Sequence, residues 1–252
     1  MLRVIALLCS ILALAGCGTT SHGSGSGEEK PVNQSAKVHT ELAGLYYERA
    51  QLGIALAELE LALQADKNYS PAYGVRGLVH MSLREDVEAE EDFRHSLSLD
   101  KNNSDIHNNY GWFLCQRGKE KESIPQFMAA IKNPLYTTPE LAYLNAGLCS
   151  KKAGNNKDAE EFLQKALLVQ PKMPQALYAL AEISFADTDY YVANKYFREF
   201  SDKADNLTAE QLWLAVRIQR KVGDRNSEAS YSMQMRKRYP DSRETQFLTR
   251  GE

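Results

Sequence analysis

The chain has 252 residues, of which 43% are hydrophobic and 25% are charged, and its formal net charge is −3. This composition is typical of a globular protein and excludes a disordered or collagen-like chain. Because there is no basic excess to attract a phosphate backbone, it also argues against nucleic-acid binding.

The first residues have the three parts of a secretory signal, namely basic Arg3, an apolar run over 4–15 and small residues before Cys17. A twelve-residue run reaches only about 18 Å as a helix, and a bilayer span needs about 20 residues. We therefore expect the run to target the chain and not to span a membrane.

The sequence Leu14-Ala15-Gly16-Cys17 resembles the lipobox of bacterial lipoproteins. In these proteins the signal is cut before the Cys, which becomes the lipidated N-terminal residue, here Cys17. Because Gly18 and not Asp follows, the resemblance implies the inner leaflet of the outer membrane. The alternative is an ordinary signal peptide with an incidental cysteine. The next residues are rich in Gly and Ser, which is typical of a flexible coil.

Small residues recur along the chain with spacings of 34, 34, 36 and 34 residues. They are Ala43, Gly77, Gly111, Gly147 and Ala181. Sixteen residues after each comes a large apolar residue, in order Leu59, Phe93, Phe127, Leu163 and Phe197. This pattern resembles the tetratricopeptide repeat, a helix-turn-helix unit of 34 residues in which small residues allow two helices to approach closely. The alternative is a plain helical bundle with accidental periodicity.

The repeat predicts an all-α fold, an α-solenoid of about six tetratricopeptide units forming a right-handed superhelix over residues 35–245. Gly118 and Gly154 fall where the turns inside two units are expected, and the sixth unit is degenerate, as terminal units often are. The expected division is a signal peptide over 1–16, lipidated Cys17 and a tether over 17–34, units over about 36–69, 70–103, 104–138, 139–173, 174–206 and 208–241, and a tail over 246–252.

No catalytic signature accompanies the repeat. The five histidines at 22, 39, 80, 95 and 107 do not have the spacing of metal ligands. Without a nucleophile, a base or a metal set, we expect no enzyme activity, no metal, no cofactor and no small-molecule substrate.

In stacked units of this type the first helices line a groove, which is the expected site for a protein partner. Asn109 and Asn145 occupy the same position in successive units, and their amides can pair with an extended peptide backbone. Trp112 offers an apolar anchor. The candidate partner-binding residues are Tyr47, Met81, Asn108, Asn109, Trp112, Gln116, Asn145 and Leu148, with Tyr178 and Phe185 continuing the wall. The alternative for any one of them is a contact with the next helix.

Cys115 and Cys149 lie on the first helices of adjacent units. In an oxidising periplasm such a pair tends to be bridged, and a loop of this length would stabilise the fold by about 3 to 4 kcal/mol. Two buried free thiols are the alternative, because packed helices often hold Cα atoms beyond disulfide reach.

A basic run occurs near the end of the chain and is typical of a solvated face, with an acidic partner or a lipid headgroup as the alternative. It consists of Arg217, Arg220, Lys221, Arg236, Lys237 and Arg238.

The whole chain resembles the PilF/PilW family of outer-membrane lipoproteins of type IV pilus biogenesis. The resemblance rests on the lipobox, the repeats, Asn108-Asn109-Tyr110-Gly111-Trp112-Phe113-Leu114, the loop from Leu135 to Pro139, and Arg236-Lys237-Arg238-Tyr239-Pro240. The family implies a non-enzymatic scaffold, anchored to the outer membrane and facing the periplasm, that supports secretin multimers and stable pili. Its expected partners are the secretin and other pilus-assembly proteins.

Two other functions stay open at this point. One is a scaffold subunit of the outer-membrane protein insertion machinery, and the other is a regulator of peptidoglycan synthesis. Cys115 and Cys149 depart from the family pattern and suggest a subgroup.

Overall fold

The computed structural model describes residues 33–202 and 206–251. The predicted signal peptide, Cys17 and all but the last two residues of the predicted tether lie outside these ranges. Asn33 is already part of the folded unit, because its side chain accepts hydrogen bonds from the first backbone amides of the first helix and donates one to the carbonyl of Ala65.

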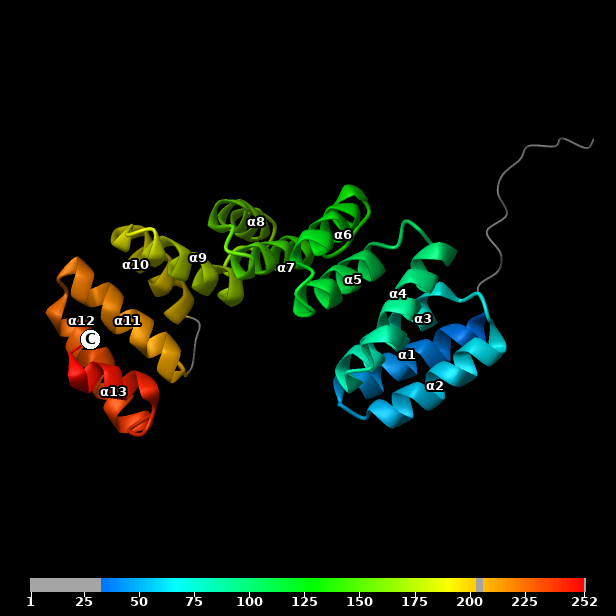
Figure 1. Cartoon of the computed structure of the whole chain (residues 1–252), viewed down its shortest axis with the longest axis horizontal. Helices are drawn as coiled ribbons and strands as arrows, with labels where there is room; N and C mark the ends of the chain where they lie inside the picture. The colour runs from blue at the N-terminus through cyan, green and yellow to red at the C-terminus, as the bar shows by residue number, and fades with distance from the viewer. Residues whose placement is uncertain (1–32, 203–205, 252) are drawn as a thin grey trace, which may run out of the picture. The chain divides into compact units, whose positions relative to one another are not determined.

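The described residues form helices and no strands, and Figure 1 shows their succession from blue to red. The helices are α1 Gln34–Glu48, α2 Leu52–Ala65, α3 Ser70–Leu83, α4 Asp86–Leu99, α5 Ser104–Gln116, α6 Glu120–Lys132, α7 Pro139–Lys152, α8 Asn156–Val169, α9 Pro174–Ala186, α10 Tyr190–Ser201, α11 Ala209–Val222, α12 Arg225–Arg238 and α13 Arg243–Arg250. None of these helices is both long enough and apolar enough to cross a membrane.

Consecutive helices pack as six pairs, from α1 with α2 to α11 with α12. Each pair also contacts the next, and the first helices of successive pairs touch one another from α1 through α9. Because every pair buries its apolar faces against its neighbours, the core is a row of interfaces. The predicted all-α solenoid of tetratricopeptide units is confirmed.

The small residues act as the repeat predicts, by letting the two helices of a pair approach. A Cβ atom added to Gly111 on α5 would lie 2.8 to 3.1 Å from three carbons of the Phe127 ring on α6. Gly77 and Phe93 make the same contact in the preceding pair, with distances of 3.0 to 3.1 Å. Both phenylalanines are fully buried, so each ring fills the space that the missing side chain leaves.

The turn inside each pair contains a residue in the left-handed region. Gly118 and Gly154 have φ of 76° and 77°, as expected for glycine at a helix end. Ala50, Arg84 and Thr188 hold the equivalent positions in other pairs with φ of 56°, 67° and 63°. The turn geometry is therefore kept even where the sequence supplies no glycine.

Basic side chains join successive pairs at the ends of their first helices. Arg117 donates to the carbonyl of Met81 at 3.1 Å, and Lys152 donates to the carbonyl of Cys115 at 2.6 Å. Carbonyls in the last turn of a helix lack partners within the helix and carry partial negative charge. Both carbonyls also accept a backbone hydrogen bond from the turn, Met81 from Arg84 and Cys115 from Gly118, so each cation adds a second hydrogen bond at the end of the preceding unit.

The tail predicted over 246–252 is wrong for most of that range, because α13 covers residues 243–250. Ser242 caps this helix, Leu248 is buried, and the ring of Phe247 lies 6.1 Å from that of Trp213 on α11. In the described part of the chain, this short amphipathic helix packs on α11 and α12, where the next unit of a solenoid would lie.

Candidate functional site

The first helices of the pairs, α1, α3, α5, α7, α9 and α11, form the surface on which the sequence places the partner-binding residues. We call it the A-helix surface. The structure divides the predicted residues among three parts of this surface.

The predicted asparagines form a bonded cluster between α5 and α7. Asn145 donates to the side-chain oxygen of Asn108 at 2.9 Å, and Asn108 donates to that of Asn109 at 3.4 Å. Asn108 is buried, which corrects the expectation that it contacts a partner, because its polar atoms already bond to the protein. Asn109 and Asn145 are half-buried. The cluster therefore joins two units and leaves only part of these two amides for a ligand.

Trp112 lies beside the two cysteines. Its half-buried ring packs against a buried cluster of Cys115, Phe127, Ala146 and Cys149. Gln116, one turn further along α5, is exposed. This part of the surface therefore combines an apolar plate with an exposed amide.

The two cysteines meet where α5 packs against α7. Their Cα atoms are 5.9 Å apart and their sulfur atoms 2.19 Å apart. The Cα separation lies within the range that a disulfide can span. The packed helices α5 and α7 therefore do not hold these two cysteines beyond disulfide reach.

Tyr47 and Met81 lie in the first two pairs and are both half-buried. The Tyr47 hydroxyl accepts a long hydrogen bond from Ser82 at 3.4 Å. Met81 packs against the core of the second and third pairs. The structure therefore does not bring them together with Trp112.

A mainly apolar pocket of about 390 Å³ lies on the A-helix surface where α7, α9 and α11 meet. It includes Leu148, a predicted residue, and Tyr178, which the sequence placed in the wall. The lining residues are Leu148, Pro174, Gln175, Tyr178, Ala179, Glu182, Phe200 and Gln211.

Arg217 on α11 lies next to this pocket's tyrosine, as part of a cluster that the sequence pattern did not reveal. Its guanidinium lies 4.7 Å from the centre of the Phe185 ring and 5.7 Å from that of Trp213. Burial lowers the pKa of Arg217 and raises the pKa of Tyr178, and each residue also feels the other's charge. The members of the basic run therefore have different environments. Arg217 packs between aromatic rings, whereas Arg236, Lys237 and Arg238 are exposed on α12.

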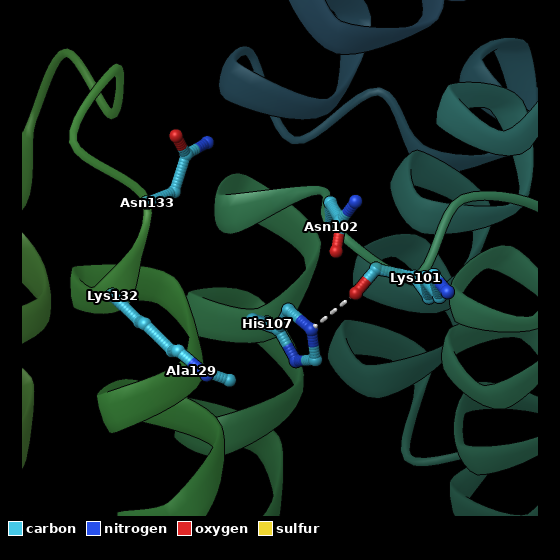
Figure 2. A pocket seen from close by; sticks show the side chains of 6 residues that line it. All are labelled: Lys101, Asn102, His107, Ala129, Lys132 and Asn133. Atoms are coloured by element: carbon cyan, nitrogen blue, oxygen red, sulfur yellow. Dashed lines mark hydrogen bonds between the residues drawn. The ribbon is translucent and has the colours of Figure 1, made fainter.

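A second cavity, of about 440 Å³, is lined mainly by residues with polar side chains and lies between α5, α6 and the loops before and after them (Figure 2). His107 lines it and uses both ring nitrogens, one with Gln126 at 2.7 Å and one with the carbonyl of Lys101 at 3.0 Å. No group of three or more metal-ligating side chains exists in the part of the chain that the structure describes. This cavity contains none of the predicted site residues.

The paired helices and the close contacts of their small residues define a tetratricopeptide-repeat protein. A family model for the tetratricopeptide repeat matches residues 141–173. The class rests on this match and on the six helix pairs.

Proteins of type IV pilus biogenesis are similar over nearly the whole chain. PilF of Pseudomonas aeruginosa, a type IV pilus assembly protein, is 27% identical over 97% of this chain and 98% of its own. Its structure superposes with a TM-score of 0.81 at 26% identity, covering 86% of this chain and 98% of that one. The crystal structure of PilW, a widely conserved type IV pilus biogenesis factor, has 33% identity and a TM-score of 0.78, covering 86% of this chain and 99% of PilW. The chain belongs to the PilF/PilW family of type IV pilus biogenesis proteins.

Proposed function

We propose that this protein is a non-enzymatic scaffold of type IV pilus biogenesis that is anchored to the outer membrane through Cys17 and faces the periplasm. It supports assembly and stability of secretin multimers, and of pili, through protein contacts on its A-helix surface. Similarity to pilus biogenesis proteins along the whole solenoid carries this proposal. The lipid anchor rests on the sequence Leu14-Ala15-Gly16-Cys17.

The site chemistry supports a binding role. Trp112 and Gln116 place an apolar ring and an exposed amide one helical turn apart, a combination that suits a peptide segment. Cys115 and Cys149 are placed for a disulfide, and such bonds persist in the periplasm and not in the cytosol. A bridge beside Trp112 would fix α5, which carries this ring, to α7.

The A-helix surface is tested by complementing a deletion strain with variants and measuring secretin multimers by gel electrophoresis. We expect Trp112→Ala and Gln116→Lys to reduce multimers and pili several-fold, because each alters the contact surface. Gln116 is exposed, so its substitution leaves the fold intact. Tyr191→Ala is the matched control, since Tyr191 is 78% exposed on the second helix of its pair.

Secretin multimers at the wild-type level in both Trp112→Ala and Gln116→Lys would contradict the role of the A-helix surface. If the deletion strain kept normal secretin multimers but lost outer-membrane protein insertion or altered its cell wall, the insertion-machinery scaffold or the peptidoglycan regulator would replace the proposal.

The anchor is tested separately with Cys17→Ser. We expect this variant to take up no radiolabelled palmitate and to keep its signal peptide, because the lipidated thiol is gone. Cys115→Ser is the control and should label like the wild type. Equal labelling of Cys17→Ser and the wild type would exclude Cys17 as the lipid attachment site.

A further inference from the structure

The pocket at α7, α9 and α11 has features of a specific recognition site. Its lining is mostly apolar, from Leu148, Ala179 and Phe200, and its volume of about 390 Å³ accommodates a large side chain. Three successive first helices contribute to it. An extended segment fits this succession, since it places a side chain about every 3.3 Å and can cross helices about 10 Å apart.

Two hydrogen-bond donors at this place are buried and poorly satisfied. The Tyr178 hydroxyl and the Arg217 Nε make no hydrogen bond of ordinary geometry with any described residue. Buried polar groups in proteins are nearly always bonded, so an orphaned pair points to a missing acceptor. Both groups act as donors here, and one oxygen-bearing group can serve them together.

The charge of Arg217 is balanced only from a distance, because the carboxylates of Glu182 and Glu210 act on it without forming an ion pair. No carboxylate of a described residue lies within 4.0 Å of its guanidinium, which packs on Phe185 and Trp213. The nearby Glu182 pairs with Lys151 at 2.7 Å, and its charge also acts on Arg217 and helps to raise the pKa of Tyr178. A half-buried cation that has no direct ion pair gains a charge-assisted hydrogen bond when a carboxylate binds to it.

We propose that this pocket binds an extended segment of a protein partner that carries a large apolar residue next to an acidic residue. The apolar side chain fills the pocket against Leu148 and Phe200, and the carboxylate accepts hydrogen bonds from Tyr178 and Arg217. This inference rests on the proposed scaffold function and names the chemistry of one partner segment.

The test measures binding of fluorescein-labelled peptides to the full-length protein by fluorescence anisotropy. Each peptide has a Gly/Ser frame with a central Phe-Glu, Glu-Phe, Leu-Glu, Phe-Gln or Ala-Glu pair. We expect the peptides with both a large apolar residue and Glu to bind most tightly. Loss of either feature should weaken binding roughly tenfold, as expected for a charged hydrogen bond or a filled apolar pocket.

Protein variants then identify the contacts. Arg217→Gln should weaken the Phe-Glu peptide roughly tenfold but leave Phe-Gln within about twofold, since only Glu offers a carboxylate to the cation. Tyr178→Phe should weaken both peptides, because the Glu carboxylate and the Gln amide oxygen can each accept from the hydroxyl. Arg225→Gln, an exposed cation on α12, is the matched control and should change neither peptide.

Absence of binding by every peptide, or an equal loss for Phe-Glu and Phe-Gln in the Arg217 variant, would overturn the inference. Equal loss in the Arg225 control would assign the effect to general charge and overturn it too. The scaffold proposal is tested through Trp112 and Gln116, which lie outside this pocket, so the two can fail independently.

Discussion

Phe127→Ala is expected to lower the free energy of unfolding by about 3 to 5 kcal/mol. The Phe127 ring is completely buried and fills the space beside Gly111. Gly111 has no side chain that could occupy this space once the ring is removed. It also packs against both cysteines, so its removal leaves a cavity at the junction of α5, α6 and α7. Urea unfolding followed by circular dichroism gives the measurement.

Met128→Ala is the matched control, because Met128 is the next residue on α6 and is 43% exposed. Its substitution should change the free energy of unfolding by less than about 1 kcal/mol. Similar losses in the two variants would show that the Phe127 ring is not the core contact described here.

Loss of the bridge between Cys115 and Cys149 should lower the free energy of unfolding by about 3 to 4 kcal/mol. The cysteines are 34 residues apart, and a cross-link over a loop of that length restricts the unfolded chain by about this amount in the chain-entropy model. The measurement compares the wild type, with and without reductant, with the double variant Cys115→Ala/Cys149→Ala.

The double variant should match the reduced wild type and should not respond to reductant. Mass spectrometry of the unreduced protein after alkylation supplies an independent check. Two alkylated thiols at these positions, or a wild type that is insensitive to reductant, would contradict the bridge.

The sequence predicted the solenoid because its signal is local and repeated. Small residues at a regular spacing and a large residue sixteen positions later fix how two neighbouring helices pack, and Gly111 with Phe127 shows the predicted contact. The positive φ at Ala50, Arg84 and Thr188 could not be predicted from these residue types, because packing imposes there a conformation that they do not favour.

The site was harder to predict, since its contacts join different repeats. Asn108 has a position typical of the groove, but the amide of Asn145, 37 residues later, holds it in the protein. The approach of Arg217 to Phe185 and Tyr178 joins α11 to α9, and in the sequence Arg217 is only one member of a basic run. A repeat pattern predicts on which face of a helix a residue lies. Contacts with neighbouring units determine whether that residue is free to bind a ligand.

The links between units are most numerous in the middle of the solenoid. Ion pairs of Arg117 with Asp86 and of Lys119 with Glu90 join the second and third pairs. Between the third and fourth pairs, the two cysteines, the bond from Asn145 to Asn108 and the bond from Lys152 to the carbonyl of Cys115 lie between the same two helices, α5 and α7. A row of similar units unfolds locally first where such links are fewest, so we expect motion to be greatest towards the ends of the solenoid and least in these middle pairs. The surface beside Trp112 then needs little ordering when a ligand binds there, and this lowers the entropic cost of binding.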